Sequence, residues 1–359
     1  KNDVRWTILE GSFEEEAEEL RKQNPGRIEE KRSHKIQIAI PDKPIARGLL
    51  CACLPTEQDT GLPFHINADF FPSSDRKKVI LADDYQSRWN RAAIKGASTT
   101  LAESLGRLPQ LCGHKYLWEI IVSVFGVSQT AKKDGQEKAF SCFWEDLYPV
   151  LRKSPVVFTE AEKWLEPSDV FLLGSEDEEE AQSIFDMLEM DIVHRDIRSL
   201  IYRHHMRYVE DLQIRRLELE HLIEALRDNG FTERIDKTAL PVLLQENSGL
   251  FLLYDEILRL LNRPQAKEKR LGLEKNLQNC SIALGRDQAL WPIRQIYCAD
   301  EKTISLFDSL GDLLPFAEDL GDAFSEIKKL FPNFTCHDAI RHFKEMYTKP
   351  EPPKIPRNW

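Results

Sequence analysis

Residues 61–91 read GLPFHINADFFPSSDRKKVILADDYQSRWNR, and this stretch carries most of the evidence about the fold. A Gly-Leu-Pro turn opens it, and residues 63–71 then alternate apolar and polar side chains, which is the pattern of a half-buried strand. The polar elbow Ser73-Ser74-Asp75-Arg76 follows, and a Trp89-Asn90 pair stands where helical periodicity begins. We expect Trp89 to be a core anchor instead of a platform for a ligand. The stretch therefore predicts a strand, a polar elbow and the start of a helix in close succession.

The residues before this stretch complete the pattern of a small sheet. Residues 5–10 and 34–40 resemble strands, and the acidic segment 12–22 between them favours a helix. The apolar run 48–54 is typical of a central strand. A strand, a helix and three further strands predict a mixed sheet with helices on one face, so we expect an α+β fold with a first domain at 1–90.

The residues after this stretch are mainly helical in pattern. We expect a helical region at 91–200, a helical C-terminal region with a short hairpin at 201–349, and a proline-rich tail at 350–359. The strongest single helix prediction is 203–228, because an apolar stripe runs along it and Asn229-Gly230 supplies a stop.

Composition limits the classes of function. The 359 residues are 42% hydrophobic and 30% charged, which is typical of a soluble globular chain with two or three domains. A net charge of −11 argues against a chain-wide nucleic-acid surface and leaves a local basic groove open. No apolar run reaches the roughly 18–20 residues that span a bilayer, so we expect no membrane partner.

The start of the chain and its cysteines indicate the kind of protein it belongs to and its cellular location. The chain opens without Met or a signal peptide on a strand-like segment, which we interpret as the downstream part of a larger protein. Its seven cysteines are irregularly spaced, which favours reduced thiols and a cytoplasmic location.

Several of these segments resemble a known family. The run 48–55, the turn and strand at 61–67, the elbow at 70–76 and the Trp89-Asn90 pair are similar to the region after the ATP-binding domain in sacsin-like repeat proteins. The elbow more distantly resembles the middle domain of the ninety-kilodalton heat-shock chaperones, which also contain a GHKL-type ATPase domain. The resemblance covers about residues 1–200. It implies that residues 1–90 form a transducer-like domain and that the chain is the portion downstream of such an ATPase domain.

The resemblance also implies a site. In that family an upstream GHKL domain binds ATP with Mg, and its Asp-x-Gly-x-Gly loop and glycine-rich lid do not occur here, so we expect no nucleotide bound by this chain alone. Arg76 matches the arginine that reaches the terminal phosphate, Lys77 is its neighbour, and Asn67 is expected to hold the loop. The interval from Asn67 to Arg76 is longer than in the heat-shock chaperones.

The role of Arg76 decides between several functions. A phosphate contact would couple ATP binding upstream to chaperone-like handling of a protein client or an effector. The alternative is that Arg76 only pairs with Asp75, Asp83 or Asp84, in a non-catalytic protein-interaction scaffold. A third hypothesis is a nucleic-acid sensor that uses the basic patch at 203–216. Homo-oligomerisation stays open, and no complete active site is visible, so the sequence does not decide whether the protein is an enzyme.

Two motifs that contain histidine lack the other residues that a kinase site or a metal site would need. His194-Arg195-Asp196 has the letters of the kinase catalytic triplet, but Ile201 stands where the kinase pattern needs Asn. Cys112-Gly113-His114 is isolated, and packing explains it better than metal binding. No Cys-x-x-Cys pair is present, so we expect no metal site.

Overall fold

The computed structural model describes residues 5–45, 47–134, 138–174, 181–203, 212–299, 301–307, 316–318, 326–332 and 334–347. Strands and helices are both present, with a small mixed sheet followed by mainly helical structure, so the α+β prediction is confirmed. The chain forms two compact units. The first unit contains residues 1–176 and 191–216, and the second contains residues 177–190 and 217–359.

The first unit is built on a five-stranded sheet in the order β1-β2-β5-β3-β4. Only β3 and β5 run parallel, and the other neighbours are antiparallel. The strands are β1 (Trp6–Ser12), β2 (Lys35–Pro41), β3 (Leu49–Ala52), β4 (Leu54–Asp59) and β5 (His65–Ala68).

The run 48–54 does contain an internal strand, β3, but this strand ends at Ala52, before the end of the run. The chain reverses at Cys53, whose φ of 61° lies in the left-handed region, and β3 and β4 form a hairpin around it. The central strand is β5, which the alternation at 63–71 identified. A run of apolar letters does not show a reversal, because the turn depends on the backbone conformation of one residue.

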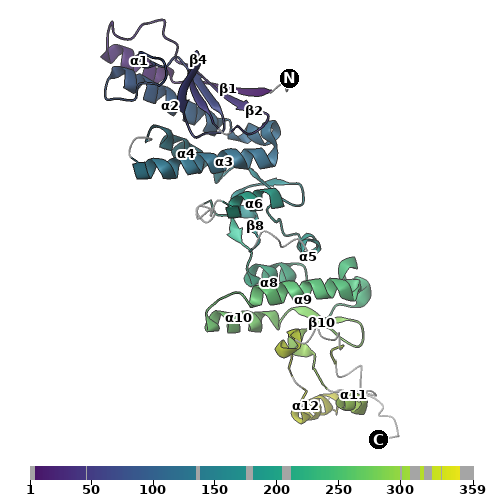
Figure 1. Ribbon diagram of the computed structural model, residues 1–359. Coiled ribbons are helices and arrows are strands. Elements are labelled where there is room, and N and C mark those ends of the chain that lie inside the picture. Colours follow the sequence, from purple (N-terminus) through teal and green to yellow (C-terminus); the bar gives the residue numbers. More distant parts are fainter. Residues whose placement is uncertain are drawn as a thin grey trace. The chain divides into compact units, whose positions relative to one another are not determined.

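Two helices cover one face of this sheet, α1 (Glu14–Gln23) and α2 (Tyr85–Glu103), and both are visible in Figure 1. The alternating residues Ile36, Ile38 and Ile40 of β2 are buried there. The approach of α2 is close: a Cβ at Gly11 of β1 would lie 1.8 Å from the Thr100 hydroxyl. Trp89 of α2 is fully buried, which confirms its predicted place in the core.

The rest of the first unit packs around the same core. Helix α2 packs against α4, and α3 packs against both α4 and α6, so the predicted boundary at residue 90 falls inside one compact unit. The additional elements are η1 (Leu105–Arg107), α3 (Leu108–Asp134), α4 (Lys138–Leu151), β6 (Val157–Phe158), β7 (Trp164–Leu165), η2 (Pro167–Asp169), β8 (Phe171–Leu172), α6 (Arg195–Arg203) and β9 (Arg215–Arg216).

The second unit is mainly helical, and the predicted short hairpin is present as β10 and β11. The buried hydroxyl of Tyr254 donates to the carbonyl of Ile282 and links α9 to this hairpin. The elements are α5 (Gln182–Met187), α8 (Leu219–Asp228), η3 (Lys237–Ala239), η4 (Val242–Gln245), α9 (Asn247–Leu261), α10 (Lys267–Leu277), β10 (Ser281–Leu284), β11 (Leu290–Pro292), η5 (Ile293–Gln295), α11 (Glu301–Phe307), η8 (Ile327–Leu330) and α12 (Cys336–Tyr347).

The predicted continuous helix at 203–228 is wrong. Helix α6 ends at Arg203, β9 occupies Arg215–Arg216, and α8 begins only at Leu219. Leu212 is buried in a turn, and Ile214 and Leu217 are buried on either side of β9, which pairs with β8. The tail predicted at 350–359 lies outside the described residues.

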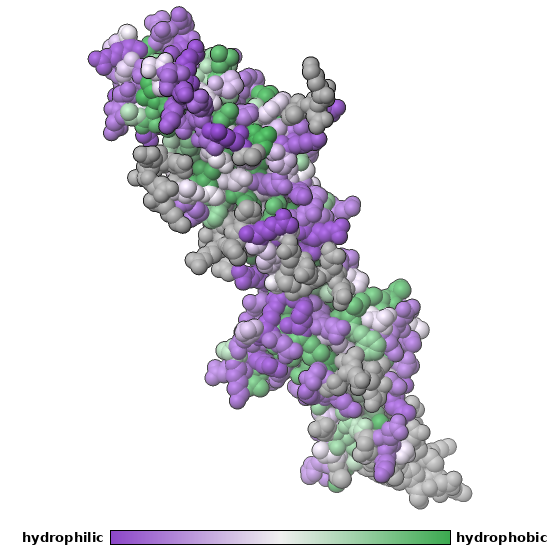
Figure 2. Space-filling model, viewed as in Figure 1, coloured by the Kyte–Doolittle hydropathy of each residue, from purple (hydrophilic) through white to green (hydrophobic). Residues whose placement is uncertain are grey.

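The surface is largely polar where it is described. In the view of Figure 2, hydrophilic residues cover most of the surface around α1, and hydrophobic residues form small patches. Among the described residues, no helix has both the length and the apolar character needed to cross a membrane.

Candidate functional site

The elbow that carries Arg76 is a short hairpin spanning residues 71–80. Its two arms are joined by hydrogen bonds from the Ile80 amide to the Phe71 carbonyl at 3.1 Å and from the Ser73 amide to the Lys78 carbonyl at 2.8 Å. The elbow is therefore a hydrogen-bonded projection that leaves the sheet after β5 and returns before α2.

A small polar network holds the tip of this hairpin. The Ser73 hydroxyl donates to the Asp75 carboxylate at 2.6 Å, and the Lys77 amide donates to the same oxygen at 3.1 Å. These two hydrogen bonds, in that order of importance, lower the pKa of Asp75, so its carboxylate stays ionised in mildly acidic solution. The Arg76 amide donates to the Ser73 carbonyl at 2.8 Å. The backbone of the tip is thus internally bonded.

Arg76 has an uncommon backbone conformation and a free side chain. Its φ of 58° lies in the left-handed region, which costs energy for a residue with a Cβ and recurs at functional sites. The residue is exposed. Its guanidinium makes no hydrogen bond or ion pair with any residue that the structure describes. The hairpin therefore exposes to solvent a guanidinium that has no polar partner among the described residues.

The carboxylates expected as structural partners of Arg76 are placed otherwise. Asp75 is bound within the tip, and Asp84 accepts a hydrogen bond from the Ser87 amide at 2.7 Å as the N-cap of α2. Asp83 is exposed and has no ion pair within the described ranges. The hypothesis that Arg76 fixes the elbow by pairing with one of these three is not what the described residues show.

Lys77 lies beside Arg76 but is engaged. Its ammonium is 3.6 Å from the Glu57 carboxylate, and its carbonyl accepts a hydrogen bond from the Glu57 amide at 2.8 Å. Since Glu57 belongs to the edge strand β4, Lys77 attaches the tip of the hairpin to the sheet. Of the two neighbouring cations, Arg76 is the one left available.

Asn67 is not brought to the hairpin. It lies in β5, and its side-chain amide donates to the Gln37 side chain of β2 at 3.2 Å. Its carbonyl oxygen is buried and has no hydrogen-bond partner. The expectation that Asn67 holds the loop is wrong for the described residues, because its polar contact runs across the sheet.

The residue that holds the hairpin is Asn90 of α2, which sequence reasoning singled out without assigning this role. Its side-chain oxygen accepts from the Phe71 amide at 2.7 Å, and its nitrogen donates to the carbonyls of Phe71 and Ile80 at 2.9 and 2.8 Å. Asn90 is fully buried. One amide thus joins both arms of the hairpin to the central helix of the unit.

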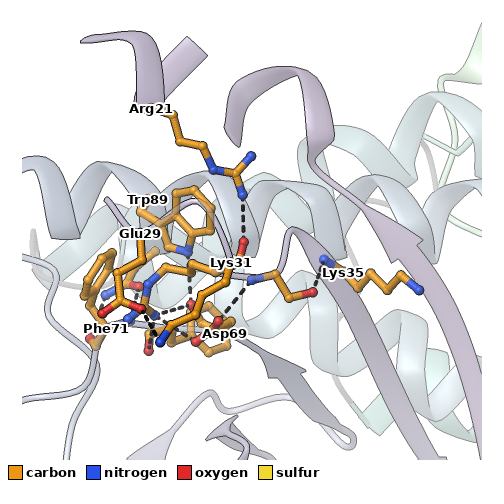
Figure 3. A network of polar contacts seen from close by, with 11 residues as sticks. Arg21, Glu29, Lys31, Lys35, Asp69, Phe71 and Trp89 are labelled. Carbon is orange, nitrogen blue, oxygen red and sulfur yellow. Dashed lines mark hydrogen bonds and ion pairs between the residues drawn. The ribbon is translucent and has the colours of Figure 1, made fainter. Parts of the chain in front are cut away.

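A second network fixes the point where β5 leads into the hairpin, and Figure 3 shows it around Asp69. The Arg32 guanidinium donates to the Asp69 carboxylate at 2.8 Å and lies 3.7 Å from the centre of the Phe71 ring. The Trp89 indole donates to the Asp69 carbonyl at 3.0 Å. No sequence signal identified Arg32, because it lies in a loop 37 residues from its carboxylate partner.

The basic patch proposed for nucleic acid is only partly described. Residues 204–211 lie outside the described residues. Arg215 and Arg216 are exposed in β9, and the Arg215 guanidinium lies over the Phe171 ring at 4.3 Å. A continuous helical face of basic side chains is therefore not formed at 215–216.

In comparisons with known proteins, no family model, curated protein or solved structure matches this chain. The likeness to sacsin-like repeats stays a hypothesis drawn from the sequence motifs.

Proposed function

We propose that this chain is the non-nucleotide-binding part of a sacsin-like GHKL ATPase, acting in the cytoplasm. An upstream ATPase domain would hold ATP with Mg, and Arg76 would contact the terminal phosphate. The observation that supports this is the exposed, unpaired guanidinium of Arg76 on a hairpin held at its tip and at its base. A fixed guanidinium suits phosphate oxygens in charge and geometry, and needs little reorganisation to bind them.

The attachments of the hairpin suggest how the contact would be transmitted. Lys77 ties it to β4 through Glu57, and Asn90 ties it to α2. Helix α2 in turn packs against α4. A phosphate that draws Arg76 toward it would therefore also displace α2, to which the hairpin is bonded. The helices packed against α2 would transmit this movement to a protein client or effector.

The test replaces Arg76 in the full-length protein. We expect Arg76→Ala to lower ATP turnover by about 10²–10³-fold, the usual effect of removing one preorganised donor to a developing charge. The melting temperature should stay unchanged, because the exposed side chain makes no hydrogen bond or ion pair with the described residues. Arg76→Lys should recover only part of the activity, since an ammonium cannot make the paired hydrogen bonds of a guanidinium.

Lys78→Ala is the matched control, because Lys78 is exposed in the same hairpin and its known hydrogen bonds are made by the backbone. If Arg76→Ala and Lys78→Ala turn over ATP at the same rate, the phosphate role is wrong. A full-length protein without ATP turnover would also contradict it. The scaffold hypothesis would then take precedence, with the hairpin serving only the fold.

A further inference from the structure

Three side chains that could bind a metal ion meet in the first unit: His114, His194 and Asp196. The Nε2 atom of His114 is 3.2 Å from an Asp196 carboxylate oxygen, and the Nδ1 atom of His194 is 3.9 Å from the same oxygen. One ligand atom from each residue lies within 4.8 Å of the others. The two histidine motifs that had no context in the sequence therefore form one cluster.

The backbone places each of the three residues at an end of a helical segment. Gly113, with a φ of 74°, interrupts α3, so that His114 begins the segment after the break. His194 immediately precedes α6, and Asp196 lies in its first turn. The His194 amide donates to the Phe158 carbonyl at 2.9 Å. Both imidazoles are thus held near β6.

Aromatic packing orients the two imidazoles. The Phe158 ring stacks on His114 with centroids 4.6 Å apart and planes at 10°. The ring of His194 lies 4.5 Å from that of His114 and 5.5 Å from Phe158. Imidazoles packed in this way lose little further rotational freedom when they bind an ion, which favours binding.

Glu160 lies next to the cluster in the position of an outer partner. One of its carboxylate oxygens is 3.9 Å from Nε2 of His194, the nitrogen that faces away from Asp196. The other accepts hydrogen bonds from the Arg195 amide at 2.7 Å and from the Arg198 guanidinium at 3.0 Å. A carboxylate behind a histidine is the usual second layer of a metal site, where it orients the ring and raises its basicity.

The buried guanidinium of Arg198 supports Glu160 from behind. Its side chain is 1% exposed, and its Nε and Nη1 atoms have no hydrogen-bond partner among the described residues. Such a buried cation is costly without an anion close by, and the Glu160 carboxylate, 3.0 Å away, is that anion. Because Arg198 holds it, the Glu160 carboxylate cannot rotate freely and can position His194.

The cluster is reachable from solvent. Side-chain exposure is 28% for His114, 17% for His194 and 42% for Asp196. An open pocket of about 340 Å³, lined by Cys112, His114 and Tyr116 among others, lies beside it. Two present hydrogen bonds must give way: the one between Nε2 of His114 and the Asp196 carboxylate at 3.2 Å, and the one that the Asp196 amide donates to Nδ1 of His194 at 3.2 Å. Both lie at the long end of the ordinary range, so each is a weak competitor for a metal bond.

We propose that His114, His194 and Asp196 bind a divalent transition-metal ion of the zinc type. Ligands bound to Zn²⁺ at about 2.0–2.2 Å lie about 3.3 Å apart in a tetrahedron. The separation of His114 from Asp196, 3.2 Å, is close to that value, and that of His194 from Asp196, 3.9 Å, requires a small closing movement. Two imidazoles and one carboxylate select zinc, cobalt, nickel or iron over calcium and magnesium, which prefer oxygen ligands. The remaining coordination positions would be open to solvent, since all three side chains are partly exposed.

The experiment uses an untagged chain freed of metal with a chelator, because a histidine tag would itself bind the probe. Zn²⁺ is titrated by calorimetry at pH 7.5, and we expect one strong site. Glu160→Gln should weaken it about 10–100-fold, the usual effect of losing an outer partner. His114→Asn and Asp196→Asn should weaken it more than that, since each removes a ligand.

His34→Gln is the matched control, because His34 is half-buried in the same unit and lies beside Ser12 and Glu14 instead of the cluster. Its affinity should equal that of the wild type. A wild-type chain without a strong Zn²⁺ site would overturn the proposal. Unchanged affinity in His114→Asn and Asp196→Asn would also overturn it, since the ion would then be bound elsewhere.

A measurement on the wild type alone covers the case in which the variants fail to fold. With isotope-labelled histidine, one equivalent of Zn²⁺ should shift the ring signals of His114 and His194 and leave those of His34 and His65 in place. Shifts confined to other histidines would contradict the proposed ligands.

Discussion

One buried amide, Asn90, holds the hairpin that presents Arg76. It satisfies the amide and the carbonyl of Phe71 and the carbonyl of Ile80 from a position inside α2. Asn can do this because it carries a donor and an acceptor on one short side chain. Asp would offer only acceptors to two carbonyls, and Gln would be one methylene too long for a fully buried position.

We therefore predict that Asn90→Ala lowers the free energy of unfolding by about 2–3 kcal/mol, because it removes three hydrogen bonds from a buried side chain to the backbone of the hairpin. Chemical denaturation monitored by circular dichroism would measure the change. Arg88→Ala, at an exposed position on the same helix, should change the stability by less than about 0.5 kcal/mol. Equal effects of the two variants would show that Asn90 does not clamp the hairpin.

At the scale of elements, local patterns identified most of the first sheet and its helices, and they failed where one residue reverses or interrupts an element. Alternation located β2 and β5, and helical spacing located α2 and α4. The reversal at Cys53 and the extended segment before α8 carry no comparable signal. The first depends on the backbone conformation of one residue, and the second depends on pairing with the distant strand β8.

The start of α2 offers a test at this scale. Asp84 caps the helix through the Ser87 amide, so we predict that Asp84→Ala lowers the free energy of unfolding by about 1 kcal/mol. Asp83→Ala is the paired control, since Asp83 is exposed and caps nothing among the described residues. Thermal melts of both variants should separate them. A larger loss in Asp83→Ala would reverse the assignment of the cap.

At the scale of the whole molecule, the two units are interleaved along the chain. Residues 177–190, which include α5, belong to the second unit, although the residues on both sides of them belong to the first. Phe185 of α5 is fully buried, and so is Phe143 of α4 in the first unit. The chain therefore cannot be cut at one position between residues 176 and 217 without separating an element from its unit.

This interleaving predicts which unit a core substitution weakens. Phe185→Ala should cost about 3–5 kcal/mol and speed hydrogen exchange in α9 of the second unit, with α2 left protected. Phe143→Ala should produce the opposite pattern. Hydrogen exchange read by mass spectrometry distinguishes the two. Faster exchange of α2 in Phe185→Ala would contradict the assignment of α5 to the second unit.

The sequence alone determined the features that depend on neighbours along the chain: the α+β class, the main strands and helices of the first unit, the hairpin at β10–β11 and the buried position of Trp89. The spacing of apolar residues matches the geometry of a helix or a strand, so these features can be predicted from one segment of the sequence at a time. The sequence also identified Arg76 as a candidate for phosphate contact. Only the fold showed that its side chain is exposed and has no polar partner among the described residues.

Tertiary structure decided the contacts between distant residues. It placed Asn90, not Asn67, at the hairpin, and it joined His114 to Asp196 across 82 positions. Such contacts follow from how whole elements pack, which no local spacing encodes, because many pairs of distant polar residues are compatible with the same helices and strands.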